Sequence, residues 1–321
     1  MSRAVVLALV VTLFSISGAW ASPERWKAEW SKTDFSKHSI VFEEIMSGGP
    51  PKDGIPSIDA PIFSSVKENS HLGAQEPVIS LSINGDHRAY PLRILTWHEI
   101  VNDKVGGKPV TVTFCPLCNA GIVFDRRLEG DAVLDFGTTG KLRNSDLVMY
   151  DRQSESWWQQ FSGEGIVGAH TGKQLTMLPS RLESFEKFAK RHPNGKVLVP
   201  NNPNMRDYGR NPYAGYDSAS APFLYFGDMP KNISPMARVV VVDDRAWSLA
   251  LLRKNGTIRS GDLELKWTEG QNSALDSTRI NEGRDVGNVT VKNKGKDAVY
   301  HVTFAFVFKA FNGKSDIILG E

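Results

Sequence analysis

The two cysteines of this 321-residue chain, Cys115 and Cys118, are the first and last residues of the segment Cys-Pro-Leu-Cys. Thiolates are ligands for Cu(I) and Zn(II), and they are also the nucleophiles of thiol-disulfide exchange. Pro116 lacks an N–H group and holds its φ near about −65°, so the segment should turn tightly and bring both sulfurs to one side. This turn is therefore the leading candidate for chemistry.

A metal centre at this turn would need further ligands, because one Cys-x-x-Cys motif supplies two of the three or four that copper or zinc takes. His98 lies 17 residues before Cys115 and is the first candidate for the third ligand. A lone histidine is more often a core residue, and only its nearness to the thiols favours His98. Behind it come His170, His87 and His301.

Two further roles for the thiols stay open at this point. A periplasmic thiol-disulfide oxidoreductase would use them for exchange, but the residues after Cys118 lack the helical pattern of a thioredoxin-like site. A structural disulfide would close a loop of about four residues, for which loop entropy predicts about 2 kcal/mol. In that last case the chain would be a ligand-binding or interaction module.

Common cofactor motifs do not fit the sequence. Haem attachment requires histidine directly after the second cysteine, where this chain has Asn119. Zinc deaminases have the pattern H-x-E, whereas Glu99 directly follows His98. The segment 137–141 lacks the spacing of a phosphate-binding loop. We therefore expect copper or zinc, and neither a nucleotide nor haem.

The elements around the turn predict how the thiols are positioned. The β-branched run Val110–Phe114 and the apolar run Ile122–Phe124 predict two strands of a hairpin, with the thiols at its tip. Pro91 begins a predicted helix over 92–101, and this helix carries His98.

The other patterns indicate a β-rich α+β fold of antiparallel meander sheets with a few short helices. They predict a hairpin over 78–90, strands over 128–136 and 147–152 joined by a turn at 137–140, a helix from the capping box of Ser180 and Glu183, and a strand over 301–311. Val239–Leu249 also echoes Val78–Leu92, since both have a β-run, a turn and Arg-Ala-aromatic-x-Leu. This repeat predicts two related β-rich units.

The N-terminus predicts export. Arg3 precedes an apolar run, Ala4–Phe14, and the small-residue pattern Ala19-Trp20-Ala21 follows, which is typical of a signal peptide over 1–21. No later run approaches the roughly 18 apolar residues of a spanning helix. We expect a periplasmic or secreted protein with no membrane span in the mature chain.

The mature chain should comprise an N-terminal extension (22–39), a cysteine-hairpin unit (40–200) and a second β-rich unit (201–321), with the two units either separate or one continuous domain. Its formal charge of +2 falls to +1 without Arg3, and the chain has no basic block. Nucleic acid is therefore not an expected partner. A small ligand or a periplasmic protein is the expected partner instead.

A polar cleft is a second place where a ligand could bind. Its candidate residues are Arg143, Asn144, Asp125, Arg126, Trp158 and Gln160. Turn-end ion pairs and hydrogen bonds that hold a β-meander are the more common role of such residues. Of the adjacent Trp157 and Trp158, one should face inward and the other should be exposed as a pocket wall, because neighbouring side chains in a strand alternate.

Four motifs occur in the order of a known family. The segments 88–103, 113–126, 147–163 and 192–198 together resemble the bacterial exported family catalogued as domain of unknown function 3179. The resemblance covers most of residues 40–310. It implies export and a single family-wide domain, and it does not choose between metal binding and redox chemistry.

Overall fold

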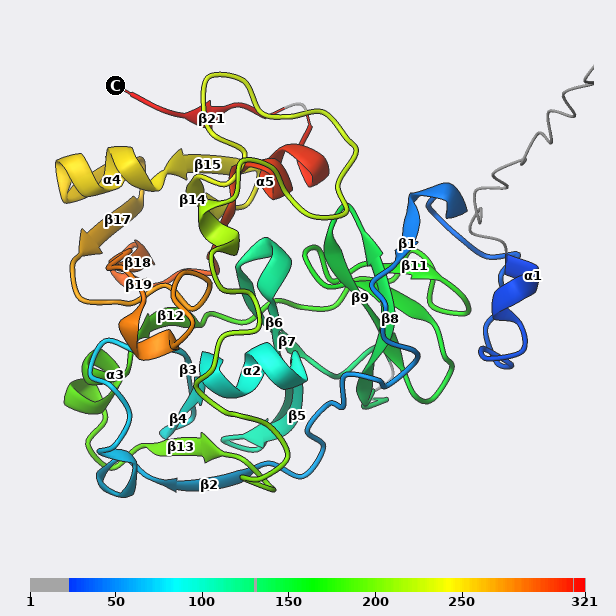
Figure 1. The fold of residues 1–321 in the computed structure, drawn as a ribbon, viewed down its shortest axis with the longest axis horizontal. Helices are drawn as coiled ribbons and strands as arrows, with labels where there is room; N and C mark the ends of the chain where they lie inside the picture. Colours follow the sequence, from blue (N-terminus) through cyan, green and yellow to red (C-terminus); the bar gives the residue numbers. More distant parts are fainter. Residues whose placement is uncertain (1–22, 130–131, 314, 321) are drawn as a thin grey trace, which may run out of the picture.

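The structure, a computed structural model, describes residues 23–129, 132–313 and 315–320 (Figure 1). The predicted signal peptide lies outside the described residues. Within them the chain forms five small sheets with short helices between the strands. The prediction of a β-rich fold with antiparallel sheets and few short helices is confirmed. No helix of the described part has the length and hydropathy to cross a membrane.

The predicted thiol hairpin is present. Strands β6 (Lys108–Cys115) and β7 (Ala120–Asp125) pair antiparallel, and the one-turn helix η3 (Pro116–Cys118) joins them. Strand β5 (Ile100–Val105) completes a three-stranded sheet in the order β5-β6-β7. Asn119 closes the turn in the left-handed region, with φ of 52°, which asparagine tolerates better than most residues.

Helix α2 (Leu92–His98) follows Pro91 as predicted, but it ends three residues earlier than the predicted helix. Glu99 turns the chain with φ of 58°, and the next residue begins β5. The β-branched Ile100 and Val101 are fully buried in this sheet, and this burial outweighs the pattern that predicted a helix over 92–101.

The meander forms a five-stranded sheet in the order β1-β8-β9-β10-β11. Its strands are β1 (Ile45–Ser47), β8 (Phe136–Arg143), β9 (Asp146–Asp151), β10 (Trp157–Gln159) and β11 (Gly165–Val167). The predicted turn at 137–140 is wrong, because these residues lie inside β8 at an irregularity in its pairing. The chain turns instead at Asn144 and Ser145, with φ of 53° and 66°, as two-residue hairpin turns require.

Two further sheets share one pattern of strand pairing. The order is β12-β3-β4-β13-β2 in one and β20-β14-β15-β21 in the other. In each, the first three strands pair antiparallel and the fourth pairs parallel to the third. The strands are β2 (Ile62–Ser65), β3 (Pro77–Ile83), β4 (Asp86–Pro91), β12 (Arg181–Ser184), β13 (Lys196–Val199), β14 (Arg238–Val242), β15 (Arg245–Ser248), β20 (His301–Phe304) and β21 (Ile317–Ile318).

A seven-residue helix follows the matching strands of both sheets. After β4 and β15 come α2 and α4 (Leu249–Asn255), and after β12 and β20 come α3 (Phe185–Arg191) and α5 (Ala305–Phe311). The repeated sequence pattern thus coincides with a repeated order of strands and helices.

Two predicted elements need correction here. The helix expected from Ser180 and Glu183 starts only at Phe185, because β12 precedes it and pairs with β3. The strand expected over 301–311 ends at Phe304 and continues as α5. All residues from His301 to Phe308 are buried, including the polar His301 and Thr303, so no solvent-exposed face distinguishes strand from helix in this run.

The remaining elements complete the described chain. They are α1 (Pro23–Trp26), η1 (Phe42–Glu44), η2 (Lys67–Asn69), η4 (Tyr216–Ser218), η5 (Ile280–Glu282), β16 (Thr257–Ser260), β17 (Leu263–Thr268), β18 (Asn288–Asn293) and β19 (Lys296–Asp297).

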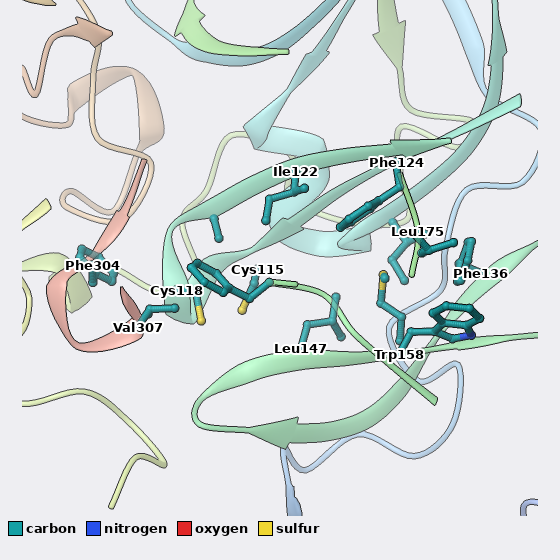
Figure 2. Packing of buried hydrophobic residues seen from close by; sticks show 14 of the residues in the cluster. Cys115, Cys118, Ile122, Phe124, Phe136, Leu147, Trp158, Leu175, Phe304 and Val307 are labelled. Atoms are coloured by element: carbon teal, nitrogen blue, oxygen red, sulfur yellow. The ribbon is translucent and has the colours of Figure 1, made fainter. Parts of the chain in front are cut away.

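The tip of the thiol hairpin is attached to strand β20. Asn119 Nδ2 donates to the carbonyl of Val302 (3.2 Å), and Thr303 Oγ1 donates to the carbonyl of Cys118 (2.8 Å). Both cysteines pack in one buried cluster with Phe304 and other residues of both units (Figure 2). The position of the thiols therefore depends on contacts far apart in the sequence.

Replacing Asn119 tests this attachment. Asn119→Ala should lower the free energy of unfolding by about 2 kcal/mol, since it removes a buried hydrogen bond and leaves alanine in the left-handed region. Asn119→Gly loses the bond but not the backbone preference, and should cost about 1 kcal/mol. Urea unfolding measures both values. Equal losses for the two variants would contradict a backbone contribution.

Candidate metal centre

A third donor joins the two cysteines in the folded chain. One donor atom from each of Cys115, Cys118 and Asp146 lies within 4.8 Å of the other two, and all three residues are buried. Asp146 is the first residue of β9, directly after the turn at Asn144 and Ser145. This set is compact enough to surround one metal ion.

Asp146 was not among the residues predicted from the sequence. It begins an apolar strand, where an aspartate is most simply explained as a turn residue. Asp146 comes close to the thiols only because β8 pairs with β9 and this hairpin packs against the thiol turn. No local pattern in the sequence could have identified it.

One carboxylate oxygen of Asp146 is saturated and the other is not. Oδ2 accepts hydrogen bonds from Gln159 Nε2 (2.6 Å) and the backbone N–H of Phe161 (2.8 Å). Oδ1 is fully buried and makes no hydrogen bond of good geometry among the described residues, and the thiols of Cys118 and Cys115 also interact with this carboxylate. Burial raises the pKa of Asp146 to about 6. A buried oxygen without a partner costs folding free energy, and a cation would remove that cost.

Both cysteines are free thiols. Their sulfurs lie 3.8 Å (Cys115) and 3.5 Å (Cys118) from the carbonyl oxygen of Ser145, to which each thiol donates. Burial raises the pKa of both thiols, that of Cys118 well above its usual value. Without a bound cation they are therefore protonated at neutral pH.

A second acid lies beside this set of three. Glu99 is buried, and burial together with the charge of Asp146 raises its pKa to about 8. The charges of Glu99 and Asp146 in turn raise the pKa of Cys115. The site thus gathers two thiols and two carboxyl groups, each of which makes ionisation of its neighbours harder.

The segment after Tyr213 covers the turn from outside. Tyr216 donates from its hydroxyl to the carbonyl of Leu117 (3.1 Å), and Ser145 Oγ donates to the carbonyl of Phe223 (2.6 Å). Tyr213 is half-buried and packs against the same cluster. Residues 201–216 are rich in Asn, Pro and Gly, which is typical of a loop, and part of this loop closes the site.

His98 does not belong to this set. Its Nδ1 lies 2.7 Å from the carbonyl of Pro56, its Nε2 lies 2.7 Å from the hydroxyl of Tyr208, and its ring stacks on that tyrosine. Both ring nitrogens therefore already have partners. The cluster of donor atoms contains none of the other candidate histidines, His170, His87 and His301.

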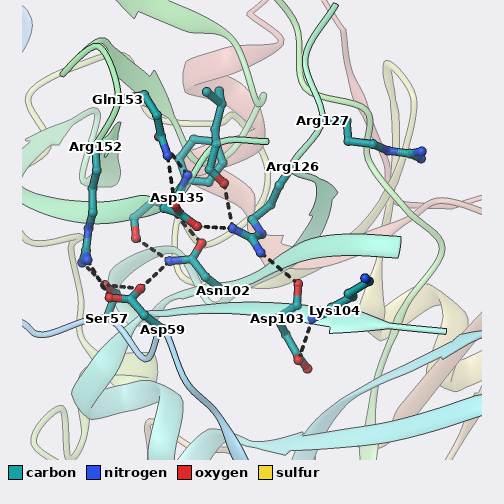
Figure 3. A network of polar contacts seen from close by, with 12 residues as sticks. Ser57, Asp59, Asn102, Asp103, Lys104, Arg126, Arg127, Asp135, Arg152 and Gln153 are labelled. Atoms are coloured by element: carbon teal, nitrogen blue, oxygen red, sulfur yellow. Dashed lines mark hydrogen bonds and ion pairs between the residues drawn. The ribbon is translucent and has the colours of Figure 1, made fainter. Parts of the chain in front are cut away.

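The arginines and Asp125 of the expected polar cleft hold strands and turns together. Arg126 donates to the carbonyls of Leu134 and Asp103 and pairs with Asp135 (Figure 3). Asp125 accepts from Lys108 and Arg127. Arg143 pairs with Glu44, and it also lines a cavity of about 440 Å³ together with Phe161 and His301. These contacts correspond to the structural role that such residues more often have.

The tryptophan pair differs from the prediction that one ring is exposed. Trp157 and Trp158 are both fully buried. Trp157 packs against Trp26 and Trp30 of the N-terminal extension, while Trp158 Nε1 donates to Asp151 (2.9 Å). The extension covers Trp157, while Trp158 lies in the separate core cluster that contains the two cysteines. Trp158 is thus not an exposed pocket wall.

The last two cleft residues lie near the thiol hairpin. Gln160 is fully buried, and its Nε2 donates to Thr113 Oγ1 (2.8 Å) and to the carbonyl of Ala120 (3.2 Å). Asn144 is the first residue of the turn that leads to Asp146. Both therefore support the site rather than line an open cleft.

The raised pKa of the thiols predicts low reactivity. In the reduced native protein, a thiol reagent at pH 8 should label Cys115 and Cys118 at least about a hundredfold more slowly than in the urea-unfolded chain, because reagent access and the thiolate fraction are both small. The rate of mass increase on iodoacetamide treatment measures this. Equal rates in the two states would show that the thiols are accessible.

Comparison with known proteins identifies the family of this chain but assigns no activity to it. No curated protein and no solved structure matches the chain. Residues 52–316 match the model of a family described as protein of unknown function (DUF3179). Because the match spans most of the sequence, the chain belongs to the DUF3179 family.

Proposed function

We propose that this protein is an exported metal-binding protein that holds one zinc ion, or alternatively copper, between Cys115, Cys118 and Asp146. The observation that carries the proposal is the convergence of the three buried donor atoms within 4.8 Å of one another. The buried Asp146 Oδ1 supports it, because this oxygen makes no hydrogen bond of good geometry among the described residues and has only the two thiols beside it, so a cation there would stabilise it.

The kinds of donor favour zinc over copper. Zn(II) accepts thiolate sulfur and carboxylate oxygen in one centre, whereas Cu(I) prefers soft sulfur ligands. Asp146 is the proposed third ligand instead of His98, because both ring nitrogens of His98 already have hydrogen-bond partners. A zinc ion would release the thiol protons on binding, because the ligand is the thiolate.

Burial makes thiol-disulfide exchange a weaker hypothesis. Cys-x-x-Cys oxidoreductases need an accessible thiolate of lowered pKa. Here both thiols are buried with raised pKa. The same burial fits a metal centre, in which the ion and not the solvent stabilises the thiolates.

Export is part of the proposal, on the evidence of the N-terminal pattern. Free thiols in an oxidising compartment tend to form disulfides. Burial and metal ligation would both protect Cys115 and Cys118 there, so a closed metal centre is compatible with a periplasmic or secreted protein.

Metal titration of the reduced, purified protein tests the centre. We expect about one equivalent of zinc per chain, with affinity lowered at least about tenfold by Cys115→Ser and by Asp146→Asn, since each removes a charged ligand. Competition with a chromophoric chelator measures the affinities, and the same titration with Cu(I) compares the two metals.

His98→Gln is the matched control for these two variants. Its zinc affinity should stay within about threefold of the wild type, because His98 lies outside the proposed ligand set. A loss of zinc affinity as large as that of Asp146→Asn would indicate that His98 is a ligand. Absence of zinc and copper binding by the wild type would exclude the proposed function.

Export has its own test. The full-length chain, expressed in a Gram-negative bacterium, should appear in the periplasm or the medium with Ser22 as its first residue, because small residues precede the expected cleavage point. Intact-mass measurement of the fractionated protein identifies the terminus. An uncleaved chain retained in the cytoplasm would contradict export.

A further inference from the structure

One ion pair distinguishes the two sheets that share a pattern of strand pairing. In the sheet of β3 and β4, Glu76 directly precedes β3 and is only 2% exposed. Its carboxylate accepts from Arg93, in the first turn of α2, through Nε (2.8 Å) and Nη2 (2.5 Å). This bidentate pair joins the helix to the chain before the strand and fills the space between them.

Backbone hydrogen bonds identify the equivalent positions in the sheet of β14 and β15. The carbonyl of Glu76 accepts from the first residue of α3, and the carbonyl of Ala237 accepts from the first residue of α5, both at 2.8 Å. Arg93 is the second residue of α2, and Ala250 is the second residue of α4. Two alanines therefore stand where the other sheet has the ion pair.

A cavity of about 820 Å³ occurs at these alanines, and both Ala237 and Ala250 line it. It lies beside α4, near β14 and β15 in Figure 1. Sites for small molecules have volumes of roughly 300–1,000 Å³. None of the three proposed metal ligands lines this cavity. Part of its wall is apolar and includes Ile233, Leu249, Leu251 and Val286.

The charged part of the wall is mainly basic. Arg238, Arg253, Lys254 and Arg284 line the cavity, with the acidic Asp285 among them. The carboxylate of Asp285 already accepts from three backbone N–H groups. The chain as a whole has a formal net charge of only +2, so this concentration of cations is local. Its field favours an anion in the cavity.

Two of these cations have no acidic partner. Arg238 and Arg284 both pair with the buried Asp217, which does not line the cavity. The side chains of Arg253 and Lys254 make no ion pair or hydrogen bond among the described residues, although the Arg253 guanidinium lies over the ring of Trp267 (5.3 Å). The charges of Arg253 and Lys254 are therefore available to a ligand.

Arg238 supplies a buried donor to the same cavity. It is 8% exposed, and its Nε is buried without a hydrogen-bond partner among the described residues. Its Nη2 donates to Asp217 (3.0 Å) and to Ser273 Oγ (2.8 Å). A buried N–H group without an acceptor costs free energy. An anionic oxygen in the cavity would provide that acceptor.

The scaffold itself does not require these basic residues. Arg238 is the first residue of β14, and the first residue of β3 is Pro77. Arg253 and Lys254 are the fifth and sixth residues of α4, and the corresponding residues of α2 are Thr96 and Trp97. The sheet that lacks the ion pair thus has a cavity and cations, whereas the equivalent positions of the other sheet carry neither.

We infer that this cavity binds a small organic anion, whose carboxylate or phosphate group contacts Arg238, Arg253 and Lys254. Guanidinium and ammonium groups bind both kinds of oxyanion through charge-assisted hydrogen bonds. The apolar part of the ligand packs on the aliphatic wall beside α4. The ligand fills the space that the pair of Glu76 and Arg93 occupies in the other sheet. This site is separate from the proposed metal centre and does not depend on it.

Calorimetric titration with phenyl phosphate, phenylacetate and the neutral benzyl alcohol tests the site. The wild type should bind at least one of the two anions with Kd below about 1 mM, and benzyl alcohol at least about tenfold more weakly. The anion that binds more tightly shows whether the ligand is a phosphate or a carboxylate. A wild type that binds neither anion would overturn the inference.

Removal of the two unpaired charges tests their role. Arg253→Gln combined with Lys254→Gln should weaken anion binding at least about tenfold, since both side chains lose their charge. Both residues are exposed, so the fold should be retained. Lys266→Gln combined with Lys292→Gln removes two exposed charges outside the cavity and should change the affinity less than about threefold. Equal losses in the two double variants would show non-specific attraction and overturn the site.

Filling the cavity provides an independent test. Ala237→Glu combined with Ala250→Arg rebuilds the ion pair of the other sheet and leaves the net charge unchanged. Anion binding should fall at least about tenfold because the space is occupied, while circular dichroism should show the wild-type fold. Anion binding that stays unchanged in this variant and in Arg253→Gln with Lys254→Gln would show that the anion binds elsewhere, and would overturn the inference.

Discussion

Burial of acidic groups beside one another is the constraint on which this structure depends. Two thiols and two carboxyl groups meet in a closed region of the core, and each raises the cost of ionising the others. The surrounding core of aromatic and aliphatic side chains excludes water, so hydration does not stabilise the charged forms of these groups. At neutral pH the raised pKa values keep both thiols and Glu99 mostly protonated in the metal-free protein.

The elements that bring these groups together share one local feature. The thiol turn ends at Asn119, the turn before Asp146 contains Asn144 and Ser145, and α2 ends at Glu99. The four residues Asn119, Asn144, Ser145 and Glu99 have positive φ. Each one reverses or redirects the chain within a few residues, which lets three separate segments present side chains to one small volume. Hydrogen bonds of Asn119 and Thr303 then attach this region to strand β20.

The repeated scaffold separates what the fold requires from what the site requires. The sheets β12-β3-β4-β13-β2 and β20-β14-β15-β21 share one pattern of pairing and the same short helices, and the second sheet forms without a cysteine turn. The unit without cysteines has Gly256 where the other has Glu99.

The sequence by itself determined the hairpin at the cysteines, the helix after Pro91, the repeat and the β-rich class. Each depends on neighbouring residues, through turn chemistry, β-branched runs or proline. It did not determine the end of α2, the turn at Asn144 or the helix α5, where burial in the tertiary structure outweighs local preference. Asp146 joined the thiols, and Trp158 became buried, only through packing between segments distant in the chain. A periodic pattern records which residues avoid water, but it does not record which of those residues will meet.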